Sequence, residues 1–137
     1  MVEITFPVEF VVHGTPVSLQ ASARSKQNWA EHIRAAAANS LAPDRFNTTE
    51  PIGIRVLYFT DRESSADLDN ILKPIFDGLN GVIYIDDKQI EWIEAHRFAV
   101  DRDFGLPSPS DLLLSLVAQE GDRLYLKIML SRDGGAS

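Results

Sequence analysis

The sequence contains no cysteine and no long apolar segment among its 137 residues. Without cysteine the chain forms no disulfide framework, no thiolate zinc site and no thiol nucleophile. No apolar run reaches the about 18 residues that a membrane-spanning helix needs, and the first residues lack the pattern of a secretory signal peptide. The length is typical of one domain. We therefore expect a single domain over residues 1–137 that works in the cytoplasm, with residues 132–137 as a flexible tail.

Basic residues are the minority, since 13 lysines and arginines face 20 aspartates and glutamates for a net charge of −7. Residues 61–103 carry eleven acids and five bases, so most of the excess lies in one third of the chain. The same segment also carries apolar residues of a folded core, which excludes a disordered acidic tail. Carboxylates concentrated in a core segment suggest a cation site.

Hydrophobic periodicity predicts an α+β fold in which two main helices pack on a mixed β-sheet. Strands are expected at residues 3–13, 52–60, 82–85, 89–100 and 123–130. Helices are expected at residues 25–41 and 68–79. Residues 110–118 fit a short helix or a strand, and we favour the helix. Pro7 favours an edge position for the first strand, and Ser110 is placed to cap the last helix. In the second helix Pro74 removes the amide that would bond the carbonyl of Asn70, which predicts a kink or a later helix start.

Five acids and a lysine form a possible site between positions 67 and 89: Asp67, Asp69, Lys73, Asp77, Asp86 and Asp87. An extended backbone at 67–69 points the first two carboxylates the same way. Asp69, Lys73 and Asp77 then lie at i, i+4 and i+8 on the polar face of the predicted helix. The pair at 86–87 follows the next predicted strand, so a helix and a strand end can bring these acids together.

Clustered carboxylates need a cation, because two of them roughly 4 Å apart repel by about 4 kcal/mol at an effective dielectric of about 20. Such a cluster persists by binding protons, pairing with basic residues or binding metal. Oxygen ligands without cysteine favour hard divalent ions, Mg²⁺ or Mn²⁺. A metal held in this way activates water and stabilises charge on a transferring phosphoryl group. Lys73, one turn from Asp69, is placed to neutralise that charge or to orient the water.

Each part of the pattern also has a plain structural interpretation. Asp67 and Asp69 are placed to cap a helix and complement its dipole. Asp69, Lys73 and Asp77 would form an exposed ion-pair ladder of small energetic worth, with Asp77 supporting the lysine. Residues 86–88 would form only a turn. From the residues alone, both interpretations stay open.

The combination of motifs resembles the RusA family of Holliday-junction resolvases, over roughly residues 10–130. The matching motifs are residues 14–20 (GTPVSLQ), 67–70 (DLDN), Lys73, 77–81 (DGLNG) and 86–90 (DDKQI). The resemblance implies a small Mg²⁺-dependent endonuclease that nicks four-way DNA junctions symmetrically in recombination and repair. It also implies a homodimer, because two cuts related by symmetry need two sites related by symmetry.

The resemblance also implies the roles of individual residues. Asp67, Asp69 and Asp87 match the metal ligands, and Lys73 matches the catalytic lysine that acts beside them. Asp86 takes the place of Asp87 if the register is shifted by one residue.

The charge of the chain departs from the family pattern. Residues 61–66 read DRESSA, where the family is often rich in arginine and lysine, and phosphate affinity comes mainly from those two residue types. Arg24, Lys26 and Arg34 are the candidates for contact with DNA. The alternative function is a non-catalytic acidic binding or regulatory protein on the same fold, which would bind a basic partner.

Overall fold

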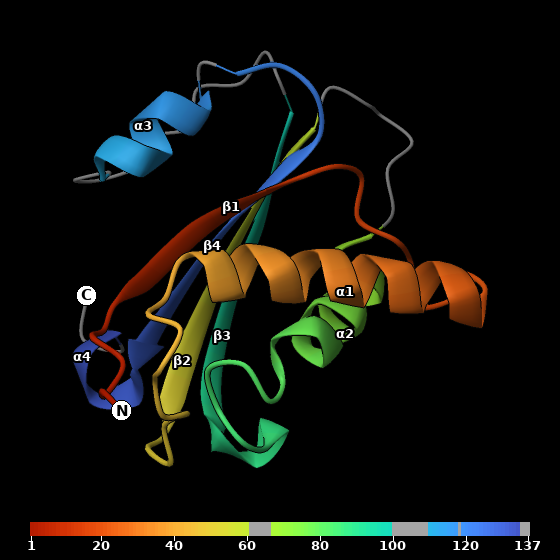
Figure 1. Cartoon of the computed structure of the whole chain (residues 1–137). Coiled ribbons are helices and arrows are strands. Elements are labelled where there is room, and N and C mark those ends of the chain that lie inside the picture. The colour runs from red at the N-terminus through yellow and green to blue at the C-terminus, as the bar shows by residue number, and fades with distance from the viewer. Residues whose placement is uncertain (61–66, 100–109, 118, 135–137) are drawn as a thin grey trace.

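A computed structural model describes residues 1–60, 67–99, 110–117 and 119–134. Its elements follow in the order β1 (Val8–His13), α1 (Ala23–Asn39), β2 (Ile52–Thr60), α2 (Leu68–Leu79), the 3₁₀ turn η1 (Asp87–Gln89), β3 (Ile90–Ala99), α3 (Asp111–Val117), β4 (Arg123–Leu130) and α4 (Ser131–Gly134). The predicted α+β class is confirmed, with α1 and α2 as the two main helices (Figure 1).

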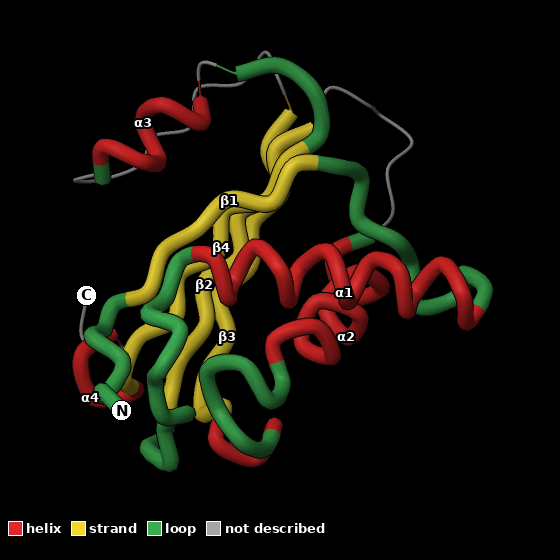
Figure 2. The backbone as a smooth tube through the Cα atoms, in the orientation of Figure 1, coloured by secondary structure: helices red, strands yellow, loops and turns green. Residues whose placement is uncertain are grey.

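The strands form one mixed sheet in the order β1-β4-β2-β3. β4 runs antiparallel to β1 and β2, and β3 runs parallel to β2. β1 begins directly after Pro7 and lies at an edge of the sheet, as predicted. Two parallel neighbours need a crossover between them, and this crossover contains α2 and η1 (Figure 2). The pairing of β2 with β3 therefore fixes the position of the crossover, which carries Asp69 in α2 and Asp87 in η1.

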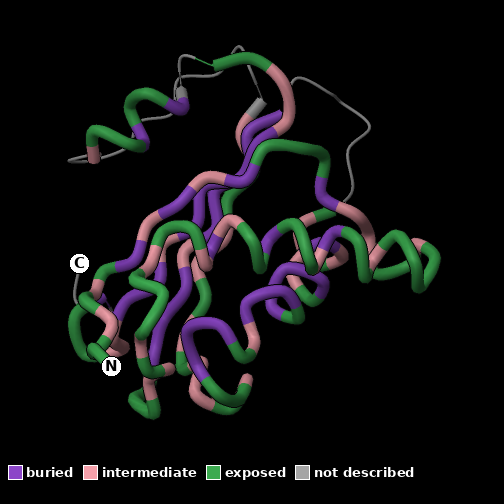
Figure 3. The backbone as a smooth tube through the Cα atoms, in the orientation of Figure 1, coloured by how far each residue is buried: buried purple, intermediate pink, exposed green. Residues whose placement is uncertain are grey.

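One face of the sheet packs against α1 and α2 and forms the main core. Alternate residues of β2 point into it, and they are fully buried: Ile52, Ile54, Val56 and Tyr58. The two helices approach closely at Gly78, where a Cβ atom would lie 2.8 Å from the carbonyl oxygen of Ala30. Half of the α2 residues are buried, while α1 is exposed along much of its length (Figure 3). The sheet and α1 therefore hold α2 in place, and α2 is the acidic helix that carries Asp69 and Asp77.

The opposite face of the sheet carries a smaller apolar cluster under α3. Leu113 and Leu116 of α3 pack against side chains of β2 and β4, namely Leu57, Phe59 and Tyr125. The predicted cap of this helix is confirmed, since the hydroxyl of Ser110 accepts a hydrogen bond from the amide of Leu113 at 3.2 Å. No helix in the described part of the chain is long and apolar enough to cross a bilayer.

Several predicted features differ from the structure. The strand expected at residues 3–13 begins only at Val8, after Pro7. Residues 82–85 form a turn instead of a strand, with an isolated bridge at Tyr84, because Val82, Ile83 and Tyr84 are buried in the core without a partner strand while Ile85 is exposed. A flexible tail was predicted from residue 132, yet Ser131–Gly134 form the short helix α4. Its last residue packs so closely on Trp92 that a Cβ at Gly134 would lie 2.3 Å from the indole ring. The predicted loop over residues 101–109 and the tail residues 135–137 lie outside the described residues.

Candidate functional site

The two acids at the start of α2 lie where the helix leaves its dipole exposed. Asp67 is the N-cap residue, and its backbone carbonyl accepts the amide of Asn70 at 3.1 Å. Its carboxylate, however, makes no capping hydrogen bond. Asp69 lies in the first turn, and both residues are exposed. Capping therefore does not occupy the carboxylate of Asp67, which leaves it free to bind a cation.

Pro74 lies inside α2 without delaying the start of the helix, which extends over Leu68–Leu79. The later start that proline suggested is therefore wrong. The carbonyl of Asn70, which loses its helical partner to Pro74, accepts a hydrogen bond from the amide of Leu19 at 2.7 Å. The ammonium group of Lys26 in turn donates to the carbonyl of Leu19 at 3.1 Å. The loop at residues 14–20 is thus attached to the first turn of the acidic helix.

Lys73 is shared between two carboxylates. Its Nζ lies 2.8 Å from Oδ1 of Asp77, one turn along the helix, and 3.5 Å from Oδ2 of Asp87. The hydrogen bond that the Lys73 ammonium donates to Asp77 is the main cause that raises the pKa of Lys73. The charge of Asp87 raises the pKa further, while partial burial lowers it. Lys73 is therefore a cation at neutral pH. No ion pair joins Lys73 to Asp69 in the described residues, so the predicted ladder exists only in its second half.

Asp87 belongs to a different segment yet faces α2. Its Oδ1 accepts hydrogen bonds from the side-chain amide nitrogen Nδ2 of Asn80 and the hydroxyl of Tyr84, each at 3.2 Å. Burial, and then the charge of Asp87, raises the pKa of Tyr84 far above its ordinary value, so its hydroxyl stays a donor. Asn80 and Tyr84 thus hold one carboxylate oxygen of Asp87, and Lys73 lies beside the other.

Asp86 has a local task instead. Its Oδ1 accepts the amide of Lys88 at 2.9 Å, and Gln89 accepts the amide of Asp86 at 2.9 Å, which completes a capping box around η1. Of the two adjacent acids, Asp87 is therefore the one whose carboxylate meets the acidic helix.

Gln89 ties this turn to the rest of the fold. Its Oε1 accepts the amides of Ile85 and Asp86, while its Nε2 donates to the carbonyls of Thr48 and Glu50, at distances of 2.8–3.0 Å. One side chain therefore joins the Asp86–Asp87 turn to the segment that leads into β2.

Gln89→Ala is expected to destabilise the fold by about 2 kcal/mol, because four hydrogen bonds are lost at roughly 0.5–1.5 kcal/mol each and water replaces some of them. Urea unfolding of both proteins measures the difference. Gln119→Ala is the matched control, since Gln119 is an exposed glutamine beyond α3. A loss no larger than that of the control would contradict the role given to Gln89.

Asp77→Asn is expected to lower the pKa of Lys73 toward its ordinary value, because the variant removes the largest cause of the increase. The raised pKa means that the pair stabilises the fold fully below the unfolded-state pKa of lysine and loses that effect as pH rises through the folded-state value. Titration of the Lys73 ammonium signal by NMR measures the change. A pKa that stays unchanged in the variant would show that Asp87 alone sets it.

The chemistry of the donors fits a hard divalent cation, because the three predicted ligands are all carboxylates. The positions of these three carboxylates fit a shared metal site less completely. No group of three or more His, Asp or Glu side chains in residues 1–60, 67–99, 110–117 and 119–134 is close enough together to hold a metal. The structure brings Asp87 to Lys73, and places Asp67 and Asp69 together at the helix start, without joining the two sets.

The three predicted DNA-contacting residues lie on α1. The guanidinium of Arg34 donates to the carbonyl of Asp77 at 3.0 Å, near the end of α2. Lys26 contacts the loop beside the first turn of α2 through Leu19. Arg24 is exposed near the start of α1. Two basic residues therefore lie beside opposite ends of the acidic helix.

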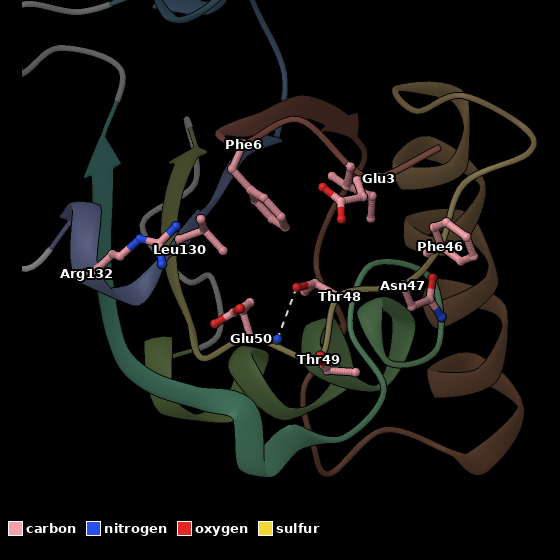
Figure 4. A pocket seen from close by; sticks show the side chains of 10 residues that line it. Glu3, Phe6, Phe46, Asn47, Thr48, Thr49, Glu50, Leu130 and Arg132 are labelled. Atoms are coloured by element: carbon pink, nitrogen blue, oxygen red, sulfur yellow. Dashed lines mark hydrogen bonds between the residues drawn. The ribbon is translucent and has the colours of Figure 1, made fainter. Parts of the chain in front are cut away.

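The pocket among the described residues is separate from these acids. It has a volume of about 430 Å³ and lies between the N-terminal segment, the chain before β2 and the end of β4. Figure 4 shows the side chains around it, which are those of Glu3, Ile4, Phe6, Phe46, Asn47, Thr48, Thr49, Glu50, Leu130 and Arg132. None of the predicted site residues lines it. Asp67, Asp69, Lys73 and Asp77 instead lie on an exposed surface.

Sequence reasoning missed the residues that support the site. Asn80 and Gln89 belong to the quoted motifs, but no role was assigned to them. Tyr84 was read as part of a strand. Asp122 gave no local signal, although its carboxylate accepts hydrogen bonds from the hydroxyls of Thr15, Tyr58 and Thr60 at 2.8–3.0 Å. These contacts join segments far apart in the chain, which spacing alone does not reveal.

The fold and the site define an α+β protein whose crossover helix presents carboxylates around a lysine. The family model described as Endodeoxyribonuclease RusA matches residues 13–105, which is more than half of the chain. The chain therefore belongs to the RusA endodeoxyribonuclease family. The match includes the loop at 14–20, the whole of α2 and the acids at 86–87. A comparison with curated proteins found no match.

Proposed function

We propose that the protein is a metal-dependent endonuclease that hydrolyses phosphodiester bonds in branched DNA, with four-way junctions as its main substrate in recombination and repair. The observation that carries this proposal is the contact of Asp87 with Lys73. It joins the second acidic motif to the helix that carries the first. Membership of an endodeoxyribonuclease family supports the class of reaction.

Asp67, Asp69 and Asp87 would hold Mg²⁺ or Mn²⁺. A metal bound there supplies a Lewis acid for the phosphate and a more acidic water as nucleophile. The chain itself contributes a fixed carboxylate at Asp87, held by Asn80 and Tyr84, and two exposed carboxylates at the start of α2. Lys73 keeps its proton and stabilises the negative charge that develops on the phosphate.

The proposal includes a homodimer, because symmetric cuts on a four-way junction need two sites related by a two-fold axis. Arg24, Lys26 and Arg34 would contact phosphates on either side of the acidic helix. Such contacts release counterions, so affinity for DNA falls as salt rises. With a net charge of −7, the protein repels DNA overall, so it is expected to bind DNA more tightly when a divalent cation neutralises part of the acidic charge.

Cleavage of labelled four-way junction, replication-fork and linear duplex DNA tests this proposal, with Mg²⁺, Mn²⁺ or EDTA present. Paired nicks at symmetric positions of the junction, absent with EDTA, are the expected result. Cutting of forks alone would keep the nuclease and change its substrate. No cutting by folded protein, together with no DNA binding at low salt, would favour the acidic binding protein instead.

A further inference from the structure

Leu19 is an apolar residue with a fixed backbone and an exposed side chain. Its amide donates to the carbonyl of Asn70 at 2.7 Å, and its carbonyl accepts the ammonium of Lys26 at 3.1 Å. Its side chain is nevertheless 45% exposed. Single exposed leucines are common on protein surfaces. This one differs because both of its backbone polar groups are held by the elements around the acidic site.

The position of Leu19 follows from the helix. Asn70 comes directly after Asp69, so the hydrogen bond from Leu19 places the loop beside the turn that carries the acidic pair. The carbonyl of Asn70 is available because Pro74 has no amide to offer it. The proline therefore creates the attachment point of the loop, three residues from the start of the helix.

The other end of the loop is also attached. The amide of Gly14 donates to the carbonyl of Asp122 at 3.0 Å, and the hydroxyl of Thr15 donates to the carboxylate of Asp122 at 2.9 Å. Pro16, between the two ends, is buried. The loop thus spans from the start of β4 to the start of α2 with both ends fixed, and it presents Leu19 at the acidic end.

We propose that Leu19 is a wedge that enters a base step next to the phosphate to be cut and unstacks it. The inference rests on the proposed nuclease function and adds how the substrate is selected. Proteins that kink DNA insert apolar side chains between base steps, and a wedge needs a fixed backbone so that binding does not push it aside. Bases beside a branch point unstack more easily than those in continuous duplex, so the wedge favours branched DNA.

Leu19→Ala is expected to reduce single-turnover cleavage of a fully paired junction roughly tenfold or more, because the unstacking energy is no longer supplied. The same junction with a mismatch at the cut site is already unstacked. On that substrate the variant is expected to approach the wild-type rate, and Leu19→Phe is expected to keep the wild-type rate on both. Leu114→Ala is the matched control, because Leu114 is 54% exposed on α3, away from the site.

A second measurement does not depend on cleavage. 2-Aminopurine placed at the cut step becomes brighter when it is unstacked. It is expected to brighten when the Asp69→Asn protein, which does not cleave, is added until the junction is saturated, as a gel-shift measurement shows, but not when the Asp69→Asn, Leu19→Ala double variant saturates it equally. An equal loss on paired and mismatched junctions, or equal brightening by both proteins, would overturn the wedge and leave the nuclease. Absence of cleavage by the wild type contradicts the proposed function, while absence of brightening contradicts the wedge.

Discussion

Asp69→Asn lowers the rate of junction cleavage by a factor on the order of a thousand, according to the proposed site, while the fold survives. The amide is nearly isosteric but uncharged, and hard divalent ions prefer charged oxygen ligands. A metal contributes several kcal/mol to stabilising the transferring phosphoryl group, and each 1.36 kcal/mol is about tenfold in rate. Because Asp69 is exposed on the first turn of α2, its loss removes only a small helix-dipole contribution of about 0.3–1 kcal/mol.

Asp111→Asn is the matched control for that experiment, because Asp111 is also an exposed acid in the first turn of a helix, α3. Both variants lose one charge and one favourable contact with a helix dipole. Single-turnover rates at saturating Mg²⁺ and thermal melting of both proteins are the measurements. Full activity in Asp69→Asn would remove Asp69 from the reaction, and a similar loss in both variants would point to a general effect of charge.

The elements with strong periodicity were predicted with their true bounds. β2 (Ile52–Thr60) and β4 (Arg123–Leu130) have the apolar patterns that are typical of strands in the middle of a sheet. The same reasoning predicted a strand at residues 82–85, where the structure has a turn. A run of four apolar residues fits a strand and a buried turn equally well, and the decision depends on whether a neighbouring strand has free backbone groups.

The candidate site likewise combines contacts within one segment, which sequence spacing predicts, with contacts between segments, which spacing does not predict. Helical spacing alone placed Asp69, Lys73 and Asp77 on one side of α2, and the contact of Lys73 with Asp77 agrees. The approach of Asp87 to Lys73 joins two segments. The order of the predicted elements allowed this approach, and the family resemblance singled out Asp87. The order of the two acids was nonetheless readable, because the spacing of Asp86 and Gln89 is that of a capping box. An acid used as a cap leaves its neighbour to face the helix.

Pro74 illustrates a prediction that was half complete. The sequence showed that the carbonyl of Asn70 loses its helical partner. It did not show which group replaces that partner, because the amide of Leu19 lies about fifty residues earlier in the chain. A buried or half-buried carbonyl needs some donor, so an internal proline in an acidic helix is a reason to search for a docked loop.

Lys73→Met separates the role of the ammonium from that of the metal ligands. The side chain stays long and unbranched, one heavy atom shorter, and loses its charge, so the developing negative charge on the phosphate loses a stabilising cation. We expect the cleavage rate to fall by about a hundredfold or more. The exposed pairs with Asp77 and Asp87 contribute about 0–1 kcal/mol each to stability, so the fold is retained.

The sign of the change in metal affinity decides between the two roles. Lys73 occupies an oxygen of Asp87, so removing it frees that carboxylate, and Mg²⁺ binds the Lys73→Met protein as tightly as the wild type or more tightly. Asp87→Asn removes a ligand and binds Mg²⁺ more weakly. Calorimetric titration of Mg²⁺ into each variant measures this, with Lys88→Met as the control for loss of a neighbouring exposed lysine. Weaker Mg²⁺ binding in Lys73→Met would mean that the lysine organises the carboxylates for the metal.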